Sequence, residues 1–345
     1  MLNPFEKIKI PPRIEDFIES ESGRLRSIGG KSIREREIRR LRDYRERIDA
    51  YLQFVRSFPR VNQLHPFYRT SLEIASGSLD RVRICLSVIA RNAVLAQRIL
   101  AKYEDMIRRS PEERANLLMR SGFGRASSIL RRSRDCVDWI SKVSSELSKG
   151  KAIDPELPTI IVAGPPNAGK STLVSKISSA KPEIANYPFT TKEIHVGHIN
   201  CGVKVQVIDT PGILDRPDQE RNVIEKKAVN ALRNLEGLII FLFDISQAPV
   251  YGAKEQLNLL REVKSLGKPL LVAFNKADVA NEDIRKEILS KVDDKVLEIS
   301  SEKGVGLDQL KGEIYNWLKS ISQDPSALLD CGDIYIDPGR GPNHR

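Results

Sequence analysis

The chain has 345 residues, of which 40% are hydrophobic and 30% are charged. This length allows two domains of ordinary size, and the composition excludes a disordered or fibrous protein. The longest strongly apolar run, residues 237–243, is far shorter than the ~20 residues that a bilayer span requires. We therefore expect no membrane partner. Because the first residues also lack the pattern of a signal peptide, we predict a cytoplasmic location.

The cysteines are Cys85, Cys136, Cys201 and Cys331, and they are scattered along the chain. Their spacing shows neither the close pairs of a zinc site nor the framework of a small disulfide-linked domain. We therefore expect all of them to be reduced thiols.

The formal net charge of +10 is distributed unevenly. Residues 1–150 contain 31 Lys and Arg against 19 Asp and Glu, whereas residues 151–345 contain 25 against 27. Of the 31 cations 25 are Arg, whose planar guanidinium pairs with phosphate and stacks on bases. This half therefore points to RNA or DNA as partner. The alternating charges of residues 34–37 leave a second interpretation open, solvated helix faces with salt bridges. Residues 82–100 and 131–134 concentrate basic groups and favour the first.

Residues 13–150 are predicted to form an all-α antiparallel helical bundle, because apolar residues recur at intervals of three and four. Two such stripes run through residues 38–55 and 129–147. Residues 79–99 are apolar on more than one side, which is typical of a helix in the middle of a bundle. Helix boundaries are expected at Pro59, Pro66, Gly77 and Pro111. Residues 1–12 are predicted to form an extended arm.

Residues 151–158 are predicted to be a linker, after which short β-rich apolar runs alternate with helical segments. This pattern indicates an α/β fold, a mostly parallel sheet wrapped by helices, over residues 159–322. Residues 323–345 are polar and rich in Gly, Pro and Asp, so we expect a loose tail. The predicted strands are Thr159–Ala163, Glu193–Asn200, Val203–Asp209, Gly237–Asp244, Pro269–Asn275 and Lys295–Ile299.

A phosphate-binding loop follows the first predicted strand and opens a helix. It consists of Gly164, Pro165, Pro166, Asn167, Ala168, Gly169, Lys170 and Ser171, with Thr172 behind it. The glycines let backbone N–H groups turn towards the phosphates, and the helix N-terminus adds its positive end. Lys170 is expected to reach the β- and γ-phosphates and Ser171 to coordinate Mg²⁺. The strand–loop–helix context disfavours the alternative of a chance glycine-rich turn.

Two further segments are expected to sense the γ-phosphate. The segment 209–212 ends a predicted strand, where Asp209 would hold Mg²⁺ through water and the Gly212 amide would bond the γ-phosphate. Residues 186–191 lack strand or helix periodicity, and a mobile loop there would let Thr191, rather than Thr190, complete the Mg²⁺ shell. The alternative is a surface loop whose threonines cap the next strand.

A third group of residues is expected to select the base. Asp278, at the end of the run Asn275-Lys276-Ala277-Asp278, can accept hydrogen bonds from N1–H and the 2-amino group of guanine, donors that adenine lacks there. Asn275 would brace the loop and Lys276 would lie along the base. The run Ser300-Ser301-Glu302 could supply a backbone N–H to guanine O6. Together with the phosphate loop, these residues make GTP or GDP the expected ligand.

The residue after Gly212 is Ile213, where many small GTPases keep a glutamine that orients the attacking water. We therefore expect slow intrinsic hydrolysis that needs a further charge. The preferred source is a potassium ion held partly by Asn167, and an arginine or RNA from a partner is the alternative. The residues expected to take part in catalysis are Lys170, Thr191, Gly212 and Asn167.

The sequence resembles the Obg-related GTPases and, more narrowly, their nucleolar GTP-binding (Nog) branch. The resemblance rests on Tyr187–Thr191 and on Asp209–Pro217, and it extends to Asn3–Phe5, Phe58–Pro59 and His65–Tyr68 in the helical half. It implies a helical domain fused to a GTPase domain. It further implies a role in assembly of the large ribosomal subunit, with its RNA and the pre-ribosomal particle as partners.

The same resemblance makes Asn167 a potassium ligand and Ile213 an ordinary family residue. The chain stops at Arg345, without the long extension of the nucleolar members, which suggests the compact form of cells without a nucleolus, such as archaea. We expect a monomer off the ribosome. Two alternatives stay open: an RNA-binding scaffold in which GTP is mainly structural, and a GTPase of translation or tRNA handling.

Overall fold

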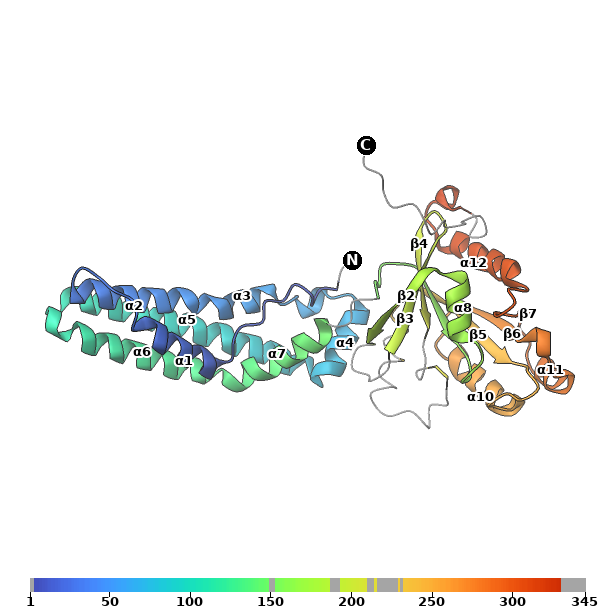
Figure 1. The fold of residues 1–345 in the computed structure, drawn as a ribbon, viewed down its shortest axis with the longest axis horizontal. Helices are drawn as coiled ribbons and strands as arrows, with labels where there is room; N and C mark the ends of the chain where they lie inside the picture. The colour runs from blue at the N-terminus through green and yellow to red at the C-terminus, as the bar shows by residue number, and fades with distance from the viewer. Residues whose placement is uncertain are drawn as a thin grey trace. The chain divides into compact units, whose positions relative to one another are not determined.

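The computed structural model describes residues 3–148, 153–186, 193–209, 214–215, 229 and 232–329 of the chain. It divides the chain into two compact units, whose elements are labelled in Figure 1. The helical unit comprises residues 4–64 and 72–148, and the α/β unit comprises residues 1–3, 65–71 and 149–345.

The helical unit is an antiparallel bundle, as predicted. Its helices are α1 (Ile14–Leu25), α2 (Ile33–Arg47), α3 (Asp49–Ser57), the end of α4 (Pro66–Ser76), α5 (Leu79–Arg109), α6 (Ala115–Arg131) and α7 (Arg134–Ser148). Helix α5 packs against α2, α3, α6 and α7, so it occupies the middle of the bundle. After a short connection, α6 and α7 run back alongside α5 (Figure 1). Ser32 and Ser78 begin α2 and α5 by accepting a backbone N–H with their hydroxyls.

Three glutamates are buried among the arginines of this bundle. Glu37 is fully buried and accepts hydrogen bonds from Arg36 at 2.9 Å and from Arg40 at 3.1 Å. The other buried pairs are Glu21 with Arg47 at 2.6 Å and Glu104 with Arg45 at 3.1 Å. A buried carboxylate without such a partner costs several kcal/mol. Part of the arginine excess therefore stabilises the bundle instead of facing a partner.

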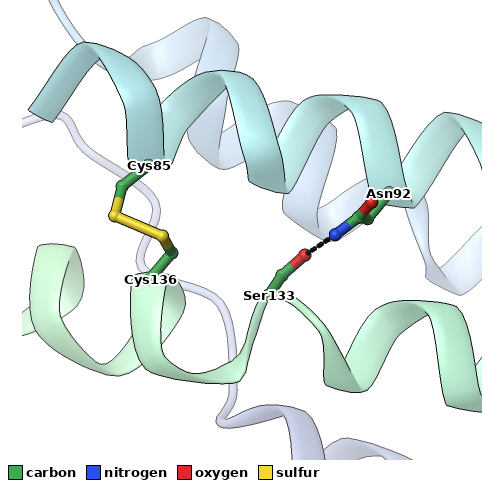
Figure 2. Close-up of a disulfide and its surroundings, with 4 residues drawn as sticks. All are labelled: Cys85, Asn92, Ser133 and Cys136. Carbon is green, nitrogen blue, oxygen red and sulfur yellow. Dashed lines mark hydrogen bonds between the residues drawn. A yellow bond between two sulfur atoms is a disulfide. The ribbon is translucent and has the colours of Figure 1, made fainter. Parts of the chain in front are cut away.

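A disulfide joins Cys85 of α5 to Cys136 of α7, with their Cα atoms 5.0 Å apart (Figure 2). Beside it, Nδ2 of Asn92 donates a buried 2.9 Å hydrogen bond to Oγ of Ser133. The expectation of reduced thiols is wrong for these two cysteines, and Cys201 is also disulfide-bonded. Sequence spacing gave no sign of the pair, because 51 residues separate cysteines that only the antiparallel packing of two helices brings together.

Helix α5 is long and apolar enough to cross a membrane by length and composition, the only such helix in the part of the chain that the structure describes. The longest uninterrupted apolar run lies elsewhere, because Arg91 and Arg98 interrupt the apolar residues of α5. In the structure its apolar face packs against four neighbouring helices. A central helix of a bundle needs this composition for its own burial.

The α/β unit contains a seven-stranded sheet in the order β2-β3-β4-β1-β5-β6-β7. Its strands are β1 (Thr159–Ala163), β2 (Ser179–Asn186), β3 (Glu193–Asn200), β4 (Lys204–Asp209), β5 (Gly237–Asp244), β6 (Leu270–Asn275) and β7 (Val296–Glu298). The pairs β2–β3 and β3–β4 are antiparallel and the rest are parallel, so the predicted mostly parallel sheet is confirmed.

Helices cover the sheet and define its core. They are α8 (Lys170–Ile177), α10 (Ala253–Lys264), α11 (Glu282–Leu289) and α12 (Leu307–Ile321). Buried residues of α8 and α12 share one core cluster with alternate residues of β1 and β5, among them Ile160, Val162 and Ile240. Helix α10 contacts β5 and α11. Because the strands are buried on both faces, their carboxyl ends form the rigid edge on which a ligand site can be built.

Strand β2 is the element that the sequence did not reveal. It lies at the edge of the sheet and pairs with β3 through a register shift between Ser179 and Glu183. Its sequence contains Pro182, which lacks an N–H and is tolerated only on edge strands and bulges. The polar, proline-containing pattern of such a strand resembles a loop.

The predicted linker is partly fixed to the sheet. The side chain of Gln206 in β4 bonds both the N–H and the carbonyl of Asp154, at 3.1 and 2.6 Å. The hydroxyl of Tyr68, in the part of α4 that belongs to the α/β unit, donates to the carbonyl of Ile153 at 3.1 Å. Thr70 of the same segment accepts a hydrogen bond from Asn234. Residues 65–71 are therefore built into the α/β unit, although the sequence assigned them to the bundle.

Candidate nucleotide-binding site

The loop between β1 and α8 has a backbone that requires its glycines. Gly164 and Gly169 have φ values of 145° and 90°. A Cβ at Gly164 would lie 2.4 Å from the carbonyl oxygen of Leu242, and one at Gly169 would lie 2.3 Å from Nδ2 of Asn275. Asn167 also has a positive φ, 61°, a conformation that asparagine tolerates better than most residues. The loop therefore lies in close contact with the carboxyl ends of β5 and β6.

Lys170, the first residue of α8, points back into this loop. Its ammonium is buried and donates to the carbonyls of Gly164 at 3.0 Å and Pro165 at 2.8 Å. Burial lowers the pKa of Lys170, and the carboxylates of Asp215 and Asp209 act in the opposite direction. A desolvated cation that donates to two carbonyl oxygens is suited to exchange them for phosphate oxygens.

Ser171 and Asp209 meet at the first turn of α8. The hydroxyl of Ser171 donates to Oδ2 of Asp209 at 2.5 Å. Asp209 is fully buried, and its other oxygen, Oδ1, has no hydrogen-bond partner among the described residues. His195 of β3, the register partner of Asp209, places Nδ1 3.5 Å from Oδ2. A buried carboxylate oxygen with open coordination beside a serine hydroxyl fits a hard cation such as Mg²⁺.

Asn275, the last residue of β6, joins three segments. Its Nδ2 donates to the carbonyl of Ala168 at 2.7 Å, and its Oδ1 accepts from both N–H and Oγ of Ser301 at 2.9 Å. The side chain therefore braces the phosphate loop against the segment after β7. Because Asn275 uses the N–H of Ser301, that N–H does not face the ligand. Among the described residues, the N–H of Glu302 has no such partner.

The residues after Asn275 present one cation and one carboxylate. Lys276 has a left-handed backbone (φ 62°), and its ammonium lies 2.7 Å from Oδ2 of Asp244 at the end of β5. The carboxylate of Asp278 lies 3.1 Å from the ammonium of Lys303. Hydrogen bonds from the side chains of Ser300 and Lys303 lower the pKa of Asp278, so the carboxylate is ionised at neutral pH.

The structure thus brings together most of the residues that the sequence singled out. Thr190, Thr191, Gly212 and Ile213 lie outside the described residues, and their expected roles stay predictions. Thr172 is exposed on the first turn of α8, behind Ser171. Three neighbours were missed: Asp244, His195 and Lys303. A sequence signal existed for Asp244 alone, because it ends a buried strand at the same sheet edge as Asn275.

The fold and this constellation define a P-loop GTPase domain preceded by a helical domain. Residues 5–154 match the family model described as the NOG1 N-terminal helical domain, and residues 159–276 match the one described as 50S ribosome-binding GTPase. The chain belongs to the NOG1 family of nucleolar GTP-binding proteins. The resemblance seen in the sequence is therefore confirmed.

Several curated relatives align with most of the chain. Nucleolar GTP-binding protein 1 of Drosophila melanogaster is 32% identical over 350 residues, covering 93% of this chain and 52% of the relative. The protein of the same name from Caenorhabditis elegans is 33% identical over 84% of this chain and 41% of the relative. An uncharacterized protein of Methanocaldococcus jannaschii is 40% identical over 65% of this chain and 63% of its own length. The chain spans about half the length of the curated relatives it matches.

The relatives also correct one expectation. We predicted a cytoplasmic location from the absence of targeting patterns. The relatives from Drosophila melanogaster, Caenorhabditis elegans and Arabidopsis thaliana are named nucleolar GTP-binding proteins. These names point to the nucleolus, so the prediction of a generic cytoplasmic protein is wrong.

Proposed function

We propose that the protein binds and hydrolyses GTP and acts in assembly of the large ribosomal subunit, where it binds ribosomal RNA of the precursor particle. The observation that carries this proposal is the combination, in one chain, of a basic NOG1-type helical domain with a domain of the 50S ribosome-binding GTPase family. The helical domain alone would not indicate the chemistry, and the GTPase domain alone would not indicate RNA as the partner.

The phosphates are held by the loop between β1 and α8. In the proposed complex Lys170 exchanges the carbonyls of Gly164 and Pro165 for β- and γ-phosphate oxygens. The backbone N–H groups of the loop and the N-terminus of α8 add positive potential where the phosphates lie. The loop is preorganised, because Asn275 holds the carbonyl of Ala168 in place. Little rearrangement is then needed on binding.

Ser171 and Asp209 would hold Mg²⁺, Asp209 through a bound water, with Thr191 completing the set. The orphaned Oδ1 of buried Asp209 supports this assignment. When bound, Mg²⁺ would supply positive charge against the negative charge that develops on the phosphates during transfer. The hydroxyl of Ser171, which bonds Asp209 in the structure, would be a ligand of the ion, and Asp209 would orient the bound water.

Asp278 selects guanine by accepting hydrogen bonds from N1–H and the 2-amino group. Its low pKa keeps it ionised, and Ser300 and Lys303 hold its carboxylate beside the loop that follows β7. The N–H of Glu302 is the donor for guanine O6, because that of Ser301 is used by Asn275. An adenine base would leave the Asp278 carboxylate unpaired.

Hydrolysis is expected to be slow without an activator. The position after Gly212 holds Ile213, which cannot orient a water molecule by hydrogen bonding. A potassium ion beside Asn167 would supply the missing positive charge, and an arginine or RNA of the particle is the alternative source. The exposed side chain of Asn167 leaves room for such an ion at the rim of the loop.

One face of α5 is the best candidate for RNA contact. Arg91, Arg98 and Lys102 are exposed, and their spacing of seven and four residues places them on one side of the helix. They have no ion-pair partner in the described part of the chain, whereas Arg36 and Arg40 are bound to buried Glu37. Unpaired guanidinium and ammonium groups in a row are available to bind successive phosphates.

Replacing Arg91, Arg98 and Lys102 by Gln tests this face. We expect affinity for precursor ribosomal RNA to fall. The negative slope of log affinity against log salt should become shallower, by about 0.9 for each lost duplex phosphate contact. The matched control is Arg39→Gln, an exposed arginine already paired with Glu35. Loss of affinity in the control alone, or a salt slope unchanged in the triple variant, would contradict the assignment.

Gradient sedimentation tests the assembly role. The full chain in native lysate is followed beside mature and precursor large subunits, once with a non-hydrolysable GTP analogue and once with GDP. Association with precursors in the analogue and release in GDP supports the proposed switch. Association in both states would favour the scaffold in which GTP is structural. Absence from large-subunit particles in both would refute the assembly role and redirect the search to translation or tRNA partners.

A further inference from the structure

The ammonium of Lys276 is held by a buried carboxylate that none of the recognised nucleotide motifs contains. Asp244 ends β5, is 1% exposed, and is the register partner of Asn275 on the neighbouring strand. Its Oδ2 lies 2.7 Å from the ammonium of Lys276, whose side chain is one-third exposed. Lys276 is thus anchored at its ammonium.

Hydrogen bonds hold both the carboxylate and the backbone of Asp244. Its Oδ1 accepts hydrogen bonds from N–H and Oγ of Ser246, at 3.0 and 2.6 Å. Gln256 of α10, fully buried, bonds both the N–H and the carbonyl of Asp244 at 2.9 Å and the carbonyl of Tyr251 at 2.8 Å. The loop after β5 is therefore tied to α10, and Asp244 has a single defined position.

This arrangement matters because lysine is flexible. Ordering a lysine side chain costs more conformational entropy than ordering most other side chains. In the structure Asn275 fixes the backbone next to Lys276 and Asp244 fixes the ammonium, so the stem is ordered at both ends. A ligand that packs on the stem then does not meet the cost of ordering it.

We infer that Asp244 is a positioning residue for the base: it holds Lys276 extended, so that the stem of Lys276 forms a preformed wall for guanine. The inference rests on the proposed guanine site. Asp244 touches neither the base nor the phosphates, and it acts through Lys276 alone. Gln256 and Ser246 hold Asp244 for this task.

The test is a double-mutant cycle with the full chain, using GDP binding by calorimetry. Asp244→Asn keeps an acceptor for Ser246 but turns the attraction for Lys276 into a contact between two donors. We expect the Kd for GDP to rise roughly tenfold. Lys276→Met keeps an unbranched apolar stem without the ammonium and should raise the Kd to a similar extent. In the double variant the two increases in Kd should not add, because Lys276→Met already removes the ammonium that Asp244 binds.

Full additivity would overturn the inference, since Asp244 would then act through the fold instead of through Lys276. An unchanged Kd in Lys276→Met would overturn it as well, and this outcome stays informative if Asp244→Asn fails to fold. If the wild-type chain does not bind GDP, the proposed function fails, a result distinct from each of these.

Discussion

Nδ2 of Asn275 donates a 2.7 Å hydrogen bond to the carbonyl of Ala168, a residue 107 positions earlier in the chain. The same side chain accepts two hydrogen bonds from Ser301. One amide group therefore connects the loop that faces the phosphates with both segments that face the base. Because Asn275 is 2% exposed, no water replaces these bonds easily when the side chain is lost.

Asn275→Ala is expected to lower the free energy of unfolding of the α/β unit by about 2–4 kcal/mol, because it leaves buried groups of Ala168 and Ser301 unpaired. GDP affinity should fall with it, because the phosphate loop is no longer braced. Denaturant unfolding and calorimetry measure both effects. Asn281→Ala is the control: it removes the cap of α11, costs about 1 kcal/mol, and should leave GDP affinity unchanged. Equal effects of the two substitutions would contradict the bracing role.

Asp278→Asn should change the preferred base of the bound nucleotide from guanine to xanthine. Xanthine carries a carbonyl in place of the 2-amino group, and the asparagine amide can donate to it while its oxygen accepts from N1–H. We expect GDP affinity to fall at least about a hundredfold and the affinity for the xanthosine diphosphate to rise above that of the wild type. Competition binding measures both. Asp283→Asn, at an exposed position of α11, should change neither. A variant that loses both nucleotides equally would mean that Asp278 acts structurally.

Lys170 should give GDP binding an alkaline limit. Burial lowers its pKa, so the free protein loses this proton below the ordinary lysine value of about 10.4. GDP affinity should fall as pH rises through the lowered pKa, since a neutral amine no longer attracts phosphate. The stability of the nucleotide-free protein should change in the opposite direction: between the two pKa values the unfolded state binds more protons, so stability rises with pH.

Lys170→Met provides the control for both measurements. Its GDP affinity should be weak and independent of pH in this alkaline range, and its stability should lose the rise with pH. Calorimetric titration and denaturant unfolding at a series of pH values give the comparison. Parallel slopes for wild type and variant would show that another group titrates.

The disulfide between α5 and α7 should stabilise the helical unit without affecting the nucleotide site. It closes a loop of 51 residues, for which loop entropy predicts about 4 kcal/mol at most. Replacing both Cys85 and Cys136 by Ser should lower the free energy of unfolding of this unit by about 2–4 kcal/mol. Far-UV circular dichroism during denaturant unfolding measures the loss. GDP affinity should stay unchanged; an unfolding curve identical to that of the wild type would show that the cross-link contributes nothing.

The parts of the molecule that could be predicted are those whose signal is contiguous. The phosphate loop from Gly164 to Ser171 and the run from Asn275 to Asp278 each place their chemistry within a few residues, next to a buried strand. The strands β1 and β5 have the predicted bounds for the same reason. A run of apolar residues that ends in a polar one marks a buried strand of a parallel sheet.

The parts that could not be predicted depend on contacts between distant segments. Strand β2 gains its structure by pairing with β3 at the sheet edge, and its own residues favour no strand. Cys85 meets Cys136 only because α5 and α7 pack side by side, as Figure 2 shows. Asp244 acquires a role only when Lys276 reaches it across neighbouring strands. In each case contacts between distant segments determine a feature that the local sequence pattern does not indicate.

Asn167 should make hydrolysis depend on potassium. It is exposed at the rim of the phosphate loop in a left-handed conformation, which alanine would strain, so the informative variant is Asn167→Gly. This change removes the carboxamide and keeps the backbone. We expect the wild type to hydrolyse GTP about a hundredfold faster in potassium than in sodium, the lower end of the effect of a charge-stabilising group. The variant should lose the difference and keep its GDP affinity. Phosphate release under saturating GTP measures the rate. Equal rates in both salts for the wild type would assign the activating charge to an arginine or RNA of the particle.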